Sequence, residues 1–133
     1  MASIHKEISL VTGPAEVWDV VRDIGAVHTR FAPGFVVNTV MDGDDRIVTF
    51  GNGFVAREVI VDLDEQRRRL AYSVRSERIA HHNASFQVLA EGQGSRLVWI
   101  ADVLPAAAAE TVSAMMEDGI QAAKRALDQL VDA

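Results

Sequence analysis

The chain has 133 residues, of which 49% are hydrophobic, and its 13 basic and 19 acidic residues give a formal net charge of −6. This size and composition predict one domain, residues 1–133, with enough apolar material for a substantial core. The acidic balance argues against nucleic-acid binding, and the absence of cysteine excludes disulfides and thiolate metal ligands. Since the chain has no apolar signal segment and no bilayer-spanning run, we expect a cytoplasmic protein without membrane insertion.

The first third of the chain predicts one strand followed by two short helices. Residues 4–11 alternate between apolar and polar side chains, as a half-buried strand does. Pro14 stands where a helix begins, and the apolar residues after it recur on one helical face until Gly25. A second short helical turn is expected over residues 26–31, ended by the Pro33–Gly34 pair.

From residue 35 onward the apolar period changes from about 3.6 to 2, which is typical of strands. The connections are short and contain Gly, Asn or Asp, so we expect hairpins and an antiparallel sheet. Residues 76–80 form a connection whose shape the pattern leaves open. The six strands are predicted at residues 35–41, 46–50, 54–63, 69–75, 82–90 and 96–104.

Residues 105–133 predict one long helix with an apolar face. At 1.5 Å per residue its length is roughly 40 Å, so the face needs a large partner. We therefore predict an α+β fold, in which a seven-stranded antiparallel sheet curls around the C-terminal helix. A curl of this kind leaves space for a small-molecule pocket. The face consists of Val112, Met116, Gly119, Ile120, Ala123, Leu127, Leu130 and Val131.

Five short segments resemble one known family and occur in the family's order: residues 14–18 (PAEVW), 56–59 (AREV), 62–64 (DLD), 68–74 (RRLAYSV) and 94–99 (GSRLVW). The chain resembles the START/Bet v 1-like (SRPBCC) superfamily, in its bacterial polyketide cyclase/dehydrase branch. The resemblance implies a helix-grip fold with an internal cavity. It implies no single function, because members include aromatases and cyclases, lipid and quinone carriers, and hormone receptors.

Glu58 is the first candidate for chemistry. Alternation divides strand 54–63 into two sets, and the resemblance favours the set containing Glu58 as the inward one. A carboxylate in an apolar cavity has a raised pKa and can act as an acid, a base or a hydrogen-bond anchor. The competing interpretation is an exposed glutamate. If Glu58 faces the cavity, E58Q should leave stability nearly intact, because a buried unpaired carboxylate is unfavourable in any case. A large loss would instead indicate a structural ion pair.

His82 and Tyr72 are the other candidate catalytic residues. Alternation gives His82 the same face as Phe86, and His82 occupies a position where the resembled family often carries an inward tyrosine. A neutral imidazole there can orient a carbonyl or hydroxyl group, although a structural histidine is an equal alternative. Tyr72 supplies a phenol, for which a core position with the hydroxyl at a rim is the commoner case.

The predicted ligand-binding residues are apolar and come from the strands, the second short helix and the terminal helix. Gly119 would leave room beside that helix, at roughly 1 kcal/mol of helix propensity. Adjacent histidines on a strand point to opposite faces, so no metal site or cofactor is predicted. The set is Phe31, Phe50, Phe54, Ala56, Val74, Phe86, Trp99, Met115, Met116 and Gly119.

Three functions remain in order of preference. The first is binding of a small hydrophobic or aromatic ligand, such as a lipid, quinone or polyketide, in an internal cavity. The second is a cyclase or aromatase that uses Glu58 with His82 or Tyr72 as its acid/base pair. The third is an interaction module, such as a homodimer, whose cavity is filled by its own side chains.

Overall fold

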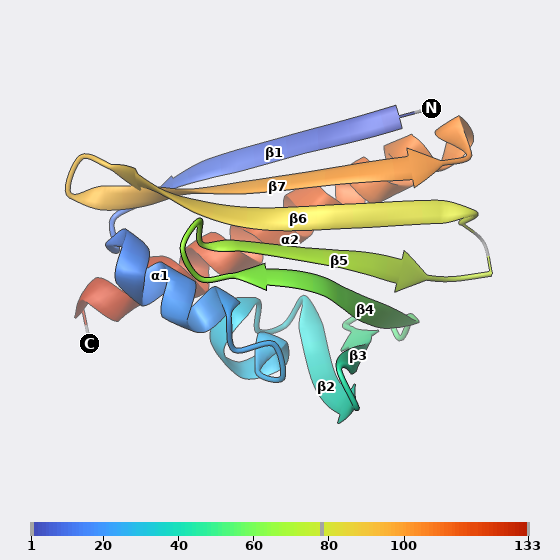
Figure 1. Cartoon of the computed structure of the whole chain (residues 1–133), viewed down its shortest axis with the longest axis horizontal. Coiled ribbons are helices and arrows are strands. Elements are labelled where there is room, and N and C mark those ends of the chain that lie inside the picture. The colour runs from blue at the N-terminus through green and yellow to red at the C-terminus, as the bar shows by residue number, and fades with distance from the viewer. Residues whose placement is uncertain (1, 78, 133) are drawn as a thin grey trace.

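Seven strands form one antiparallel sheet in the computed structural model, which describes residues 2–77 and 79–132. The order of the strands across the sheet is β1-β7-β6-β5-β4-β3-β2. Figure 1 shows the long helix α2 (Ala109–Asp128) lying against one face of this sheet, which confirms the predicted helix-grip fold. The strands are β1 (Ala2–Leu10), β2 (Val36–Asp42), β3 (Asp45–Phe50), β4 (Val55–Asp64), β5 (Arg69–Arg75), β6 (His81–Glu91) and β7 (Gly94–Leu104).

The helices follow the sequence pattern with two differences. Helix α1 (Pro14–Val21) starts at its proline as predicted but ends before Gly25, and the following turn, η1 (Val27–Phe31), is a π-helix. The predicted terminal helix is α-helical only in α2; 3₁₀ turns flank it at η2 (Ala106–Ala108) and η3 (Gln129–Asp132). Residue 133 lies outside the described residues. Within the described ranges, no helix is long and apolar enough to cross a membrane.

The core lies between α2, α1 and the concave face of the sheet. Val17, Leu97 and Leu127, from α1, β7 and α2, are each 0% exposed. At the end of α2, the hydroxyl of Thr12 donates to the carbonyl of Leu127 at 2.6 Å, and Ser95 donates to the carbonyl of Thr12 at 2.8 Å. A helix leaves its last carbonyls without partners inside the helix, so these bonds join the helix end to the sheet.

Strand β4 determines which side chains reach the interior. Its pairing with β5 shifts by one residue between Ile60 and Asp62, at a β-bulge. The bulge lies beyond Glu58, so the alternation of the first half of β4 is preserved, and Ala56 and Glu58 are both buried. This confirms the inward orientation predicted for the Glu58 set.

Candidate functional site

A cavity of about 70 Å³ lies between the sheet, η1 and α2. Its wall is mostly apolar and rich in aromatic side chains, with Phe31, Phe35, Phe50, Phe86 and Trp99. Three polar side chains interrupt that wall: Arg46 from β3, Glu58 from β4 and Tyr72 from β5. The site therefore combines an apolar enclosure with a single polar corner.

Arg46 and Glu58 form a buried ion pair in this corner. The Nε atom of Arg46 donates to Oε1 of Glu58 at 2.7 Å, and the two side chains are 5% and 10% exposed. The Nη1 atom of Arg46 also donates to the carbonyl of Ile24 at 3.4 Å. Glu58 is thus buried together with a charged partner. Of the two expectations for E58Q, this arrangement favours a loss of stability, because the substitution would break a structural ion pair.

The sequence analysis missed Arg46, although a signal was present. Thr49 pairs with Val55 across the Gly51–Gly53 turn, and counting outward from there places residue 46 opposite residue 58. Alternation from the buried Val48 also turns Arg46 inward. A buried arginine is not expected from composition, because charged side chains are seldom fully buried.

Tyr72 lies beside the ion pair. The guanidinium carbon of Arg46 is 5.3 Å from the centre of the Tyr72 ring, and the indole N–H of Trp99 donates to the Tyr72 hydroxyl at 3.0 Å. Burial raises the pKa of Tyr72 far above its usual value, and the negative charge of Glu58 raises it further. The phenol therefore stays protonated. No acceptor among residues 2–77 and 79–132 takes its proton, which is available to a ligand.

Gly119 allows α2 to approach the aromatic wall. A Cβ atom at this position would lie 2.8 Å from Cε2 of Phe35 and 3.0 Å from Cζ3 of Trp99, closer than side chains pack. The ring of Phe86 stacks on Trp99, with 4.6 Å between the ring centroids. The glycine is thus explained by close contact between the helix and two rings of the cavity wall.

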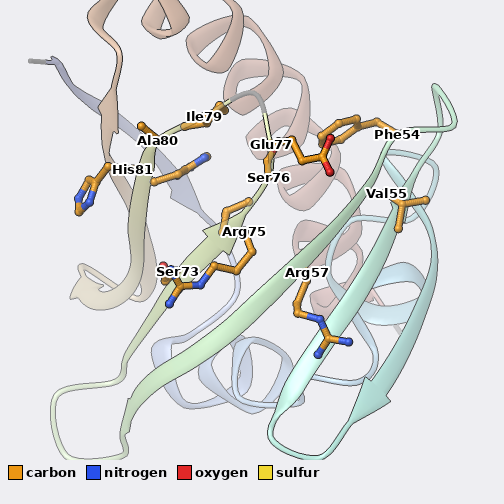
Figure 2. A pocket seen from close by; sticks show the side chains of 12 residues that line it. Phe54, Val55, Arg57, Ser73, Arg75, Ser76, Glu77, Ile79, Ala80 and His81 are labelled. Atoms are coloured by element: carbon orange, nitrogen blue, oxygen red, sulfur yellow. The ribbon is translucent and has the colours of Figure 1, made fainter.

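The remaining predicted residues lie elsewhere. Phe54, Val74 and His82 line a second hollow of about 700 Å³ at one end of the sheet, most of whose lining residues are labelled in Figure 2. Glu58 and Tyr72 therefore share one cavity, whereas Glu58 and His82 line different ones. Three further predicted residues, Ala56, Met115 and Met116, line neither hollow.

His82 is partly buried in the second hollow. Its Nδ1 atom is buried and has no hydrogen-bond partner in the described part of the chain. Burial lowers the pKa of His82, and the neighbouring His81 lowers it further, so the imidazole is neutral at pH 7. No group of three or more His, Asp or Glu side chains among the described residues is arranged to hold a metal ion.

Comparison with known proteins first defines the fold class. The structure of XoxI from Bacillus cereus has a TM-score of 0.86 at 16% identity, covering 98% of each chain. A START superfamily protein from Mycobacterium smegmatis has a TM-score of 0.72 at 13% identity, covering 98% of this chain and 97% of that one. Norcoclaurine synthase from Thalictrum flavum, in complex with dopamine and hydroxybenzaldehyde, has a TM-score of 0.71 at 18% identity, covering 98% and 86%. These likenesses establish a START/Bet v 1-like fold.

The sequence then gives the family. Residues 1–132 match the family model described as polyketide cyclase / dehydrase and lipid transport, and the chain belongs to this family. No curated protein matches the sequence.

Proposed function

We propose that the protein binds a small hydrophobic or aromatic molecule that carries a hydroxyl or carbonyl group, in the cavity between the sheet and α2. The observation that carries this proposal is the polar corner of Arg46, Glu58 and Tyr72 inside an aromatic wall. Ligand sites typically combine an apolar enclosure with a few convergent polar groups, which orient the ligand.

The polar corner has unused hydrogen-bonding capacity. Oε2 of Glu58 accepts no hydrogen bond from any residue that the structure describes. The hydroxyl group of Tyr72 likewise donates no hydrogen bond to any of these residues. The corner can therefore accept a bond from a ligand hydroxyl or donate one to a ligand carbonyl. A buried ion pair is seldom more stabilising than apolar packing of the same volume, so its presence here favours a role in recognition.

The size of the cavity limits the ligand. A volume of about 70 Å³ corresponds to roughly two water molecules at ~30 Å³ each, whereas drug-sized ligands occupy ~300–1,000 Å³. Binding therefore requires part of the wall to move. Phe35 is only half-buried and lies on the connection between η1 and β2, and π-helical turns such as η1 are frequent at functional sites. We propose that the Phe35 ring swings outward to admit a molecule of one or a few rings.

Thermal unfolding tests this proposal. Hydroxybenzaldehyde, which is bound by norcoclaurine synthase with the same fold, is compared with benzaldehyde, and fatty acids, quinones and flavonoids extend the panel. A ligand of the native state at 100 times its Kd adds about 2.7 kcal/mol of stability, so Tm should rise with concentration.

The variant Y72F provides the control for the polar corner. It removes the donor to a ligand carbonyl, which both aldehydes carry, so the Tm response to both should fall. The advantage of hydroxybenzaldehyde over benzaldehyde, which depends on Glu58 as the acceptor for the hydroxyl group, should remain. A Tm that stays constant for every compound would contradict the proposal and would favour the interaction module, whose cavity is filled by its own side chains.

A second candidate function is enolisation followed by ring closure. It is favoured by the position of the free Oε2 of Glu58 in the same cavity as the protonated Tyr72. The carboxylate would remove a proton next to a ligand carbonyl while the phenol donates a hydrogen bond to the carbonyl oxygen. NMR can follow hydrogen–deuterium exchange at the methyl group of acetophenone in D₂O. Exchange faster than in buffer, and reduced in Y72F, is expected; exchange at the buffer rate would contradict catalysis.

A further inference from the structure

The larger hollow, of about 700 Å³, forms where strands β5 and β6 separate. The pairing of β5 with β6 stops at Ser73 and Asn83, whereas the pairing of β5 with β4 continues to Arg75, opposite Arg57. The last residues of β5 therefore remain attached to β4 and diverge from the start of β6. Figure 2 shows the resulting cleft, with residues from all three strands around it.

The cleft has an apolar part and a basic part. Phe54, Val74 and Ile79 line it and pack against the hydrophobic core as half-buried side chains. Arg57 and Arg75 also line it, and their positions in the alternation place both on the sheet face opposite to α2. A small amphiphilic molecule bound in the cleft could therefore contact apolar side chains and an arginine at the same time.

The two arginines differ in their partners. Nη2 of Arg57 contacts Asp42 at 2.8 Å and Nη1 contacts Asp45 at 2.9 Å, so two carboxylates neutralise this guanidinium. Arg75 has no carboxylate partner within the described ranges, although the chain as a whole is acidic. The guanidinium of Arg75 therefore keeps a positive charge that an added anion can pair with.

The acidic side chain of the cleft lies away from Arg75. Glu77 lines the hollow, but Figure 2 shows its carboxylate on the side of Phe54, whereas the Arg75 side chain extends toward Ser73. His81 also lines the cleft, at the start of β6. The surroundings of Arg75 therefore suit a carboxylate.

We infer that this cleft is a second binding site, for a small organic acid with an apolar body. The carboxylate pairs with the planar guanidinium of Arg75, which can donate two parallel hydrogen bonds. The apolar body covers Phe54, Val74 and Ile79. The hollow has the volume of ordinary small-molecule sites, so it needs no rearrangement, in contrast to the inner cavity.

A titration with 2-naphthoate, followed by ¹⁵N NMR, tests this site. The neutral compound 2-naphthamide has the same ring system without the carboxylate. Comparing the two affinities therefore gives the contribution of the carboxylate to binding. Amide signals of residues 54–57, 73–77 and 79–82 should shift on addition of naphthoate. Because a hydrogen bond to a charged group contributes about 1.5–3 kcal/mol, R75Q should weaken naphthoate binding about 10-fold or more, and naphthamide should bind wild type as weakly as naphthoate binds R75Q.

Two further variants make the result specific. R125Q removes an equivalent exposed arginine from α2, remote from the cleft, and should leave the affinity unchanged. R75K keeps the charge but loses the planar fork, so its affinity should lie between those of wild type and R75Q. The spectrum of each variant without ligand verifies its fold. Equal affinities of wild type and R75Q would overturn the inference. It would also be overturned if naphthoate failed to bind, or if the shifts centred on η1 and Trp99, since the acid would then occupy the inner cavity.

Discussion

The interior between α2 and the sheet has two halves that differ in packing. Beneath the end of α2 lies a close-packed half, in which Ala123 and Leu127 are fully buried and Thr12 hydrogen-bonds the helix end. Beside Gly119, in the middle of α2, lies the half that holds the cavity, and the wall there includes the half-buried Phe35. One half is thus packed like an ordinary core, whereas the other contains a cavity and the charged side chains of Arg46 and Glu58.

This difference indicates where stability and function reside. In the packed half, the buried polar side chains among residues 2–77 and 79–132 are Thr12 and Ser95, which are uncharged and hydrogen-bonded to backbone carbonyls. The cavity half buries an ion pair beside aromatic rings, an arrangement that apolar residues of equal volume would match or exceed in stability. A local departure from good packing rules is expected at functional sites. The comparison makes distinct predictions for substitutions in each half.

The largest effect is expected at the ion pair. R46M leaves the Glu58 carboxylate buried without its partner and should lower the free energy of unfolding by about 3–5 kcal/mol. The double variant R46M/E58L removes both charges and should recover most of this loss. Urea denaturation measures both. The matched control is R57Q, which breaks the two surface ion pairs of Arg57 with Asp42 and Asp45 and should cost only about 1 kcal/mol. Equal losses for R46M and R57Q would contradict the burial of the pair.

Truncation of one side chain in each half should separate packing from function. L127A removes a fully buried side chain and should cost about 2–5 kcal/mol. F35A removes a half-buried ring and should cost clearly less, while raising the affinity for hydroxybenzaldehyde because the cavity is already open. Denaturation and ligand titration give the two quantities. An F35A protein as destabilised as L127A, and without improved binding, would remove the distinction between the halves.

The smallest effect is expected for G119A. Alanine gains up to about 1 kcal/mol in helix propensity, but its Cβ overlaps Phe35 and Trp99, and overpacking costs about 1–3 kcal/mol. We expect a net loss near 1 kcal/mol and weaker ligand binding. In the F35A background the loss should shrink, because one of the two overlaps is gone. A loss of the same size in both backgrounds would show that Phe35 does not occupy this space.

Local periodicity was sufficient to predict the fold. The strands from β2 to β7 lie within one or two residues of their predicted positions, because hairpin turns and alternation are properties of neighbouring residues. Glu58 was also placed correctly, since the β-bulge of β4 falls beyond it. The ends of the helices were less accurate, because the π-helical and 3₁₀ turns depend on tertiary contacts.

The site was only partly predictable. Arg46 faces inward because of the hairpin register, a relation between two strands that composition alone does not reveal. His82 lies on the expected strand, but β5 and β6 separate before reaching it, so it lines the outer cleft. The small volume of the inner cavity depends on how Phe35 and Trp99 pack against Gly119, which no single segment encodes.

The most direct test of ligand binding in the inner cavity uses the two tryptophan indole signals in a ¹⁵N NMR spectrum. The Trp99 N–H donates to Tyr72 inside the cavity, whereas the Trp18 N–H donates to Glu65 at 2.7 Å, outside it. On titration with hydroxybenzaldehyde we predict that the Trp99 signal moves with saturation and the Trp18 signal stays in place. A Trp99 signal that does not move, under conditions where the compound raises Tm, would show that the ligand binds elsewhere.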